Sequence, residues 1–156
     1  MFEKVLVPLD GSELAECSLS HIKKMAKTGA VGEVVLLNAV VLALPFREIN
    51  LDDNGISTTF DFNAFRNAHL EKSKKYLSRV QSQLSGDGIK VKTVSIEAES
   101  PAHAIVTYAH ENGIDTIVIT THGYTGMKKM LFGSVAFRVL HESHVPVLLI
   151  RPESCR

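Results

Sequence analysis

The chain has 156 residues, and its 17 Lys and Arg balance 17 Asp and Glu, so the formal net charge is zero. Hydrophobic residues make up 45% and charged residues 22% of the chain, a globular composition that excludes intrinsic disorder. A neutral chain has no long-range field to attract nucleic acid or anionic lipid. We therefore expect neither nucleic acid nor a membrane as a partner.

A chain of this length buries about 70% of the surface that its unfolded form exposes, so we expect one domain over residues 1–156. The two cysteines, Cys17 and Cys155, match no metal-ligand spacing. The first ten residues lack the pattern of a signal peptide, and no apolar run approaches the ~20 residues of a membrane span. These features predict a cytoplasmic protein.

Short apolar runs alternate with helical patterns along the whole chain. We expect strands at residues 5–7, 34–41, 91–96, 116–120 and 145–150. We expect helices from the N-cap Ser12 to about Gly29, and over 61–84, 101–112 and 134–142. This alternation predicts an α/β fold with a parallel sheet, helices on both faces and right-handed crossovers.

Residues 42–60 differ from the rest because they carry turn chemistry without a sustained period. The cluster Asp52-Asp53-Asn54-Gly55 lacks the alternate spacing and closing Glu of a calcium loop, so we interpret it as a plain turn. Loops of this length inside compact domains are often functional or mobile.

The segments that follow the first and fourth strands hold the candidate site. Ligands of open α/β sheets bind beyond the carboxyl ends of the strands, where the winding direction reverses. Pro8-Leu9-Asp10-Gly11-Ser12 follows the first strand, and a glycine-containing loop from Thr120 to Ser134 follows the fourth. If these two strands are neighbours, the two segments face each other across one crevice.

The second segment has the composition of a phosphate site. Gly123 and Gly126 allow close backbone approach, and Gly133-Ser134 stands where a helix begins, with free N–H groups and a positive dipole end. The alternative is that Ser134 only caps the helix. The chain has no Gly-Lys pair, which excludes a P-loop.

These residues resemble the universal stress protein family. The resemblance rests on Val7-Pro8-Leu9-Asp10-Gly11-Ser12 at the end of the first strand and on all but the first position of the family's late Gly-x2-Gly-x9-Gly-[Ser/Thr] pattern, and it covers essentially the whole chain. Thr120 takes the place of the first glycine, while Gly123, Gly133 and Ser134 keep the rest, so we expect the Thr120 side chain to narrow the crevice.

The resemblance implies a three-layer Rossmann-like sandwich, with a five-stranded parallel sheet of order 3-2-1-4-5 flanked by four helices. It also implies an ATP site, occupied by ATP, ADP or AMP, with Pro8, Leu9 and Asp10 at the adenine and ribose. The full set of implied nucleotide-binding residues is Pro8, Leu9, Asp10, Ala39, Ile119, Thr120, His122, Gly123, Gly133, Ser134 and Val135.

Several candidates stay open between a functional and a structural role. Asp10 could instead cap a turn, and His122 could donate to a phosphate or make only a backbone hydrogen bond. Lys128 and Lys129 could cover a triphosphate or be solvated. The pair His141 and His144 lacks an evident third ligand, so we expect no protein metal site.

We expect a nucleotide-dependent stress-response regulator with at most slow ATP hydrolysis, because no general base or nucleophile converges on the crevice. Mg²⁺ or Mn²⁺ could accompany the nucleotide. The alternative is a dimeric interaction protein of the same fold that binds no nucleotide. The apolar final strand, 145–150, predicts a homodimer paired through a sheet edge, as the resemblance also implies.

Overall fold

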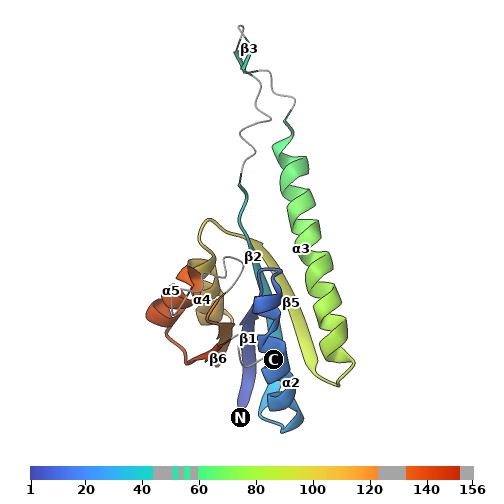
Figure 1. The fold of residues 1–156 in the computed structure, drawn as a ribbon, viewed down its shortest axis with the longest axis vertical. Helices are drawn as coiled ribbons and strands as arrows, with labels where there is room; N and C mark the ends of the chain where they lie inside the picture. Colours follow the sequence, from blue (N-terminus) through green and yellow to red (C-terminus); the bar gives the residue numbers. More distant parts are fainter. Residues whose placement is uncertain (44–50, 53–54, 57–59, 123–132, 152–156) are drawn as a thin grey trace.

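A central parallel sheet of five strands, in the order β5-β2-β1-β6-β7, forms the middle layer of the molecule (Figure 1). The computed structural model describes residues 1–43, 51–52, 55–56, 60–122 and 133–151. The strands are β1 (Phe2–Pro8), β2 (Val31–Val40), β5 (Lys90–Glu97), β6 (Thr116–Thr120) and β7 (Val147–Ile150). Counted along the chain, this is the order 3-2-1-4-5, and it confirms the predicted fold.

Helices cover both faces of this sheet. One face carries α1 (Glu13–Glu16), α2 (Ser18–Lys27) and α3 (Phe62–Ser85), and the other carries α4 (Pro101–Glu111) and α5 (Ser134–Glu142). The first predicted helix is divided at Cys17. The Cys17 N–H is shared between the carbonyls of Glu13 and Leu14, at 3.2 and 3.3 Å, so the hydrogen-bond ladder shifts there although the backbone stays helical.

The core lies in two layers because successive side chains of each strand point to opposite faces. Val5, Val7 and Leu36 pack beneath α2 and α3, whereas Leu6 and Leu37 pack beneath α4 and α5. All five of these side chains are completely buried. Burial on both faces explains why the strands of the sequence are nearly continuous apolar runs.

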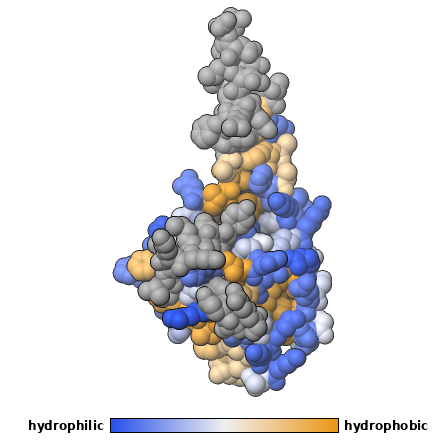
Figure 2. Space-filling model, viewed as in Figure 1, coloured by the Kyte–Doolittle hydropathy of each residue, from blue (hydrophilic) through white to orange (hydrophobic). Residues whose placement is uncertain are grey.

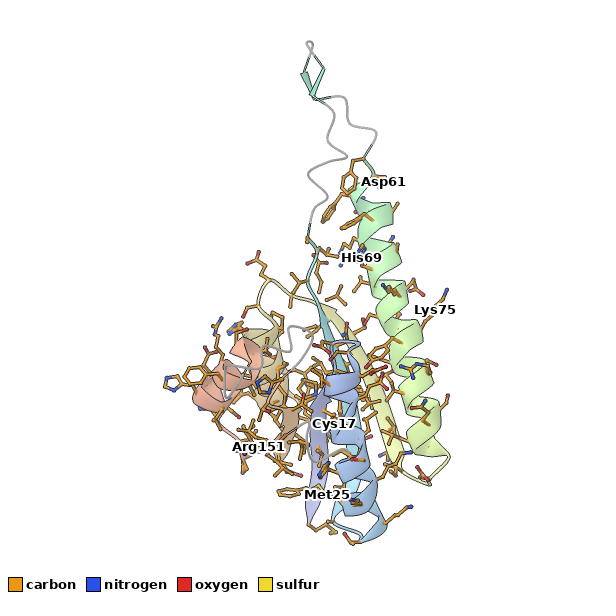
Figure 3. The ribbon with its side chains drawn as sticks, viewed as in Figure 1. Cys17, Met25, Asp61, His69, Lys75 and Arg151 are labelled. Atoms are coloured by element: carbon orange, nitrogen blue, oxygen red, sulfur yellow. The ribbon has the colours of Figure 1, made fainter. Side chains whose placement is uncertain are left out.

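Helix α3 begins at an Asp61 N-cap, whose carboxylate accepts a hydrogen bond from the Ala64 N–H at 3.0 Å. Its 24 residues span about 36 Å, so its N-terminal turns extend beyond the sheet (Figure 1). His69 points toward the β2 side of the helix and Lys75 points away from it (Figure 3). An ion pair between Arg66 and Glu97 joins the projecting part of α3 to the end of β5.

The segment predicted to be a loop contains a short hairpin. β3 (Leu51–Asp52) pairs antiparallel with β4 (Gly55–Ile56) outside the main sheet. Strands of two residues are too short to show any periodicity in a sequence. The sequence therefore predicted the turn between them but not the strands. Nowhere in the described ranges does a helix combine the length and the apolar character needed to cross a membrane.

Candidate functional site

A cavity of about 310 Å³ lies beyond the carboxyl ends of β1, β2 and β6. β1 is the strand where the winding reverses, because it pairs with β2 on one side and with β6 on the other. This is the crevice in which ligands of open α/β sheets bind, and its volume falls in the range of small-molecule sites. The lining residues are Pro8, Leu9, Asp10, Ala15, Leu37, Ala39, Val41, Pro101, Ile105, Ile119, Thr120, Thr121, Gly133, Ser134, Val135 and Ala136.

The chemistry of the wall changes from one side of the cavity to the other. The side formed by β2 and α4 is entirely apolar, with Ala39, Val41, Pro101 and Ile105 among its side chains. Hydrophobic surface is exposed at the narrow part of the molecule in Figure 2. Val41, which directly follows β2, is 49% exposed. The polar side chains of the wall come instead from the β1 end, the β6 end and α5.

The turn after β1 carries Asp10, which stands between these two sides. Asp10 Oδ1 accepts hydrogen bonds from the Ser12 N–H at 2.9 Å and the Ser12 Oγ at 2.6 Å. The same Ser12 Oγ accepts from the Ala15 N–H at 3.0 Å and so caps α1. Gly11 between them has φ +86° with open space around it, so the turn requires glycine for its backbone conformation. Asp10 therefore caps the turn and also lies on the cavity wall, where it is accessible to a ligand.

Tyr76 of α3 lies behind this turn. Its hydroxyl is buried and has no hydrogen-bond partner among the described residues. Burial raises the pKa of the Tyr76 hydroxyl above its ordinary value, and the carboxylates of Glu16 and Asp10 raise it further. Arg79 lies over the Tyr76 ring, 5.4 Å from its centroid, and pairs with Glu16 at 2.7 Å.

The N-terminus of α5 forms the opposite wall. Gly133 is the N-cap and provides no side-chain cap, and its own N–H donates to the Thr121 carbonyl at 2.6 Å. The first helical hydrogen bond runs from the Phe137 N–H to the Gly133 carbonyl. The N–H groups of Ser134, Val135 and Ala136 therefore have no partner within the helix, which gives this end a partial positive charge.

Thr120 and Thr121 close the end of β6. Both are buried, at 5% and 2% exposure, and both line the cavity. The Thr120 hydroxyl donates to the His122 carbonyl at 2.8 Å, and the Thr121 Oγ1 lies 3.0 Å from His122 Nδ1. The Thr120 side chain thus occupies space on the wall, and its hydroxyl is held by the adjacent backbone.

The structure brings together nine of the eleven predicted site residues on the cavity wall, namely Pro8, Leu9, Asp10, Ala39, Ile119, Thr120, Gly133, Ser134 and Val135. His122 is not part of this wall, and Gly123 lies outside the described residues, as do Lys128 and Lys129. Sequence reasoning missed seven of the lining residues, namely Ala15, Leu37, Val41, Pro101, Ile105, Thr121 and Ala136. The rule that sites follow strands applied to the ends of β2 and β5 would have found Val41 and Pro101.

The histidine pair near the C-terminus is divided between two contacts. The His141 ring stacks on Phe137, with centroids 6.4 Å apart, whereas His144 meets His110 edge-on at 6.1 Å. Throughout the residues that the structure describes, no three His, Cys, Asp or Glu side chains lie close enough together to hold a metal ion.

Comparison with known proteins assigns the chain to a family. The sequence model of the universal stress protein family matches residues 1–151. The chain belongs to the universal stress protein family. It is 33% identical to universal stress protein MJ0577 of Methanocaldococcus jannaschii over 161 aligned positions, which cover 97% of this chain and 96% of the relative.

Solved structures of universal stress proteins share the fold. The structure of MJ0577 superposes with a TM-score of 0.78 and covers 97% of this chain and 96% of its own. A universal stress protein in complex with cAMP has a TM-score of 0.63 at 17% identity, covering 97% and 98% of the two chains. A family member from Arabidopsis thaliana with AMP bound has a TM-score of 0.65 at 16% identity, covering 96% and 91%.

Proposed function

We propose that this universal stress protein binds an adenine nucleotide, with ATP as the principal ligand, and that the bound nucleotide regulates its part in the stress response. The observation that carries the proposal is the order of chemistry across the cavity. The apolar side lies at the end of β2, the Asp10 carboxylate follows β1, and a helix N-terminus without a side-chain cap comes after β6, in the strand order β2-β1-β6 of the sheet. A nucleotide presents a base, a sugar and phosphates in that same order.

The apolar side suits the base. Ala39 of β2, Val41 directly after β2, and Pro101 and Ile105 of α4 all line this side, and a flat aromatic ring bound among them would lose its contact with water. A purine ring carries few charges to desolvate, so an apolar slot with backbone groups at its edge is a suitable environment.

The centre and the opposite wall suit the sugar and the phosphates. The Asp10 carboxylate can accept hydrogen bonds from ribose hydroxyls, which are donors. The N–H groups at the start of α5 and the Ser134 hydroxyl can donate to phosphate oxygens, since helix N-termini are ready-made anion sites. The structures with cAMP and AMP show that the family fold accommodates adenine nucleotides in other members, which supports extending this ligand class to the present chain.

The site is built for binding rather than for rapid hydrolysis. Asp10 is the single ionisable side chain among the described residues of the cavity wall, and Ser12 already holds one of its oxygens. Hydrolysis needs a group that orients or activates water at the γ-phosphate. We therefore propose at most slow turnover, and we assign any Mg²⁺ or Mn²⁺ to the nucleotide phosphates.

A homodimer paired through β7 is the second part of the proposal. β7 is an edge strand of the sheet, and Leu148 on it is 41% exposed. On the neighbouring α5, Phe137 and Leu140 are 56% and 44% exposed. An apolar edge is normally covered or blunted with charge, and pairing with a second copy across a two-fold axis would cover this one.

The test is identification of the ligand that the protein carries. Protein purified without added nucleotide is denatured, and the released small molecules are identified by mass spectrometry, while calorimetry compares ATP with GTP on the stripped protein. ATP, ADP or AMP in the release, with preference for ATP over GTP, supports the proposal. No released nucleotide together with no ATP binding would overturn it and favour the alternative, an interaction protein in which the Thr120 side chain helps to fill the crevice.

A further inference from the structure

A chain of hydrogen bonds runs beneath the sheet to the turn that carries Asp10. Asn38 lies on β2 and faces α3, and its Nδ2 donates to the Leu9 carbonyl at 2.6 Å. Ser73 Oγ of α3 donates to Asn38 Oδ1 at 2.8 Å, and Ser95 Oγ of β5 donates to Ser73 Oγ at 2.6 Å. Asn38 is the single amide in the apolar run of β2, and Ser73 is buried at 7% exposure.

The direction of this chain follows from the chemistry of its ends. The Leu9 carbonyl can only accept a hydrogen bond, so the nitrogen of the Asn38 amide must face it. The amide oxygen then faces Ser73, which must donate, and the Ser73 oxygen is left to accept from Ser95. Reversing the amide would set two oxygens against each other at the Leu9 end. Each polar side chain in this series of hydrogen bonds therefore has one orientation, and the series is fully satisfied only in that arrangement.

These hydrogen bonds constrain the backbone of Leu9, next to Asp10. The Leu9 N–H donates to the Leu37 carbonyl at 2.8 Å, so the Asn38 amide completes the hydrogen bonding of Leu9 on its carbonyl side. The Leu9 carbonyl belongs to the peptide unit that leads directly into Asp10. With both polar groups of Leu9 held, the direction in which the chain enters the Asp10 turn is fixed.

We propose that Asn38 is a positioning residue for the nucleotide site. Its hydrogen bond to the Leu9 carbonyl holds the Asp10 carboxylate where it can accept hydrogen bonds from the ribose. The inference rests on the proposed function of the cavity. Asn38 itself is not part of the cavity wall, so it acts on the ligand only through the Leu9–Asp10 peptide. Ser73 orients the amide, and Ser95, one bond further away, contributes least.

The test compares ATP with 2′,3′-dideoxy-ATP by calorimetry on full-length variants. Asn38→Leu keeps the side-chain size but removes the donor to Leu9. We expect it to lower ATP affinity about tenfold, the loss of one hydrogen bond to a charged group, and to lower dideoxy-ATP affinity less than about twofold. Ser95→Ala keeps the Asn38 bond to Leu9 and should leave the ratio of the two affinities close to wild type.

Val80→Ala is the matched control for stability. Val80 is completely buried on the same helix as Ser73 but has no polar group, so its truncation lowers the melting temperature and should leave the ratio unchanged. Amide chemical shifts of Asp10 and Ser12 provide a second readout in the ligand-free protein, and Asn38→Leu should move them more than Val80→Ala does.

Each outcome is decisive. A wild-type protein that does not bind ATP overturns the proposed function and this inference together. A wild-type protein that prefers ATP over dideoxy-ATP, with an Asn38→Leu variant that keeps this preference or loses both ligands equally, overturns the inference alone. Loss of the preference in Asn38→Leu, with the preference retained in Val80→Ala, supports it.

Discussion

The phosphate end of the cavity can be tested by one added side chain at Gly133. This residue is the N-cap of α5 and has φ −69° and ψ 156°, an extended conformation that valine adopts without strain. The Gly133→Val variant should therefore fold. Valine is a poor N-cap compared with glycine, so the variant should lose about 1 kcal/mol of stability and melt roughly 2–4 °C lower.

The effect on ligand binding should be larger than the effect on folding. Gly133 lines the cavity directly before the N–H groups of Ser134 and Val135, so branched methyl groups there stand where a phosphate must approach. Losing a single charge-assisted hydrogen bond costs about 1.5–3 kcal/mol. We therefore expect ATP affinity to fall at least tenfold, which is ~1.4 kcal/mol.

The assay is calorimetric titration with ATP and with adenosine, which has no phosphate. Adenosine affinity should fall less than about threefold, because the lost groups face only the phosphates. Gly86→Val is the control, since Gly86 ends α3 with φ −60° and an added Cβ there would meet the Ser82 carbonyl at an ordinary 3.5 Å. A folded Gly133→Val variant with unchanged ATP affinity would falsify the assignment of the phosphates to α5.

Three further predictions address the sugar, the edge strand and a buried phenol. Asp10→Ala should lower ATP affinity about tenfold and hardly affect 2′,3′-dideoxy-ATP, which lacks the hydroxyls to lose; equal losses in calorimetry would remove Asp10 from the ribose. Leu148→Lys should shift a dimer toward monomer in sedimentation velocity, whereas Leu149, which packs against the core, is the poorer probe because its replacement also disturbs the fold; a wild-type monomer at micromolar concentration would rule out the interface. Tyr76→Phe should be neutral or stabilising, because the hydroxyl lacks a hydrogen-bond partner within the described residues. The pKa of Tyr76 is raised in the folded state, so the folded protein disfavours the ionised phenol: stability is unaffected by this group below its ordinary pKa near 10 and falls as the pH rises above that value. The alkaline fall in melting temperature should therefore be smaller in Tyr76→Phe, and an unchanged profile would contradict this account.

The strands of the main sheet, their order and a cavity-lining segment at the end of the first strand could be predicted from the sequence. The run Thr116–Thr120 and the helix Ser134–Glu142 match their predicted bounds, because a buried strand and an amphipathic helix each carry their period in neighbouring residues. The segment Pro8-Leu9-Asp10 could be identified for the same reason, since it lies at the end of a strand and its turn chemistry is local.

The edge position of the last strand was also predictable, but the consequences for its side chains were not. The sequence indicated an apolar edge at 145–150, and β7 does lie at the edge of the sheet. Which leucine is exposed depends on how α4 and α5 cover the strand. Val147 and Leu149 pack against the core cluster, and Leu148 is left exposed.

The hydrogen bonds that support the site arise from tertiary packing and could not be predicted from the sequence. The Gly133 N–H, expected to be free for a ligand, is taken by the Thr121 carbonyl. Asn38 reaches the Leu9 carbonyl 29 positions away, and Ser73 lies a further 35 positions along the chain from Asn38. A polar residue in a strand pattern does not reveal its partner, because that partner is set by the register of neighbouring strands and by the packing of a helix, and both arise only when distant segments meet.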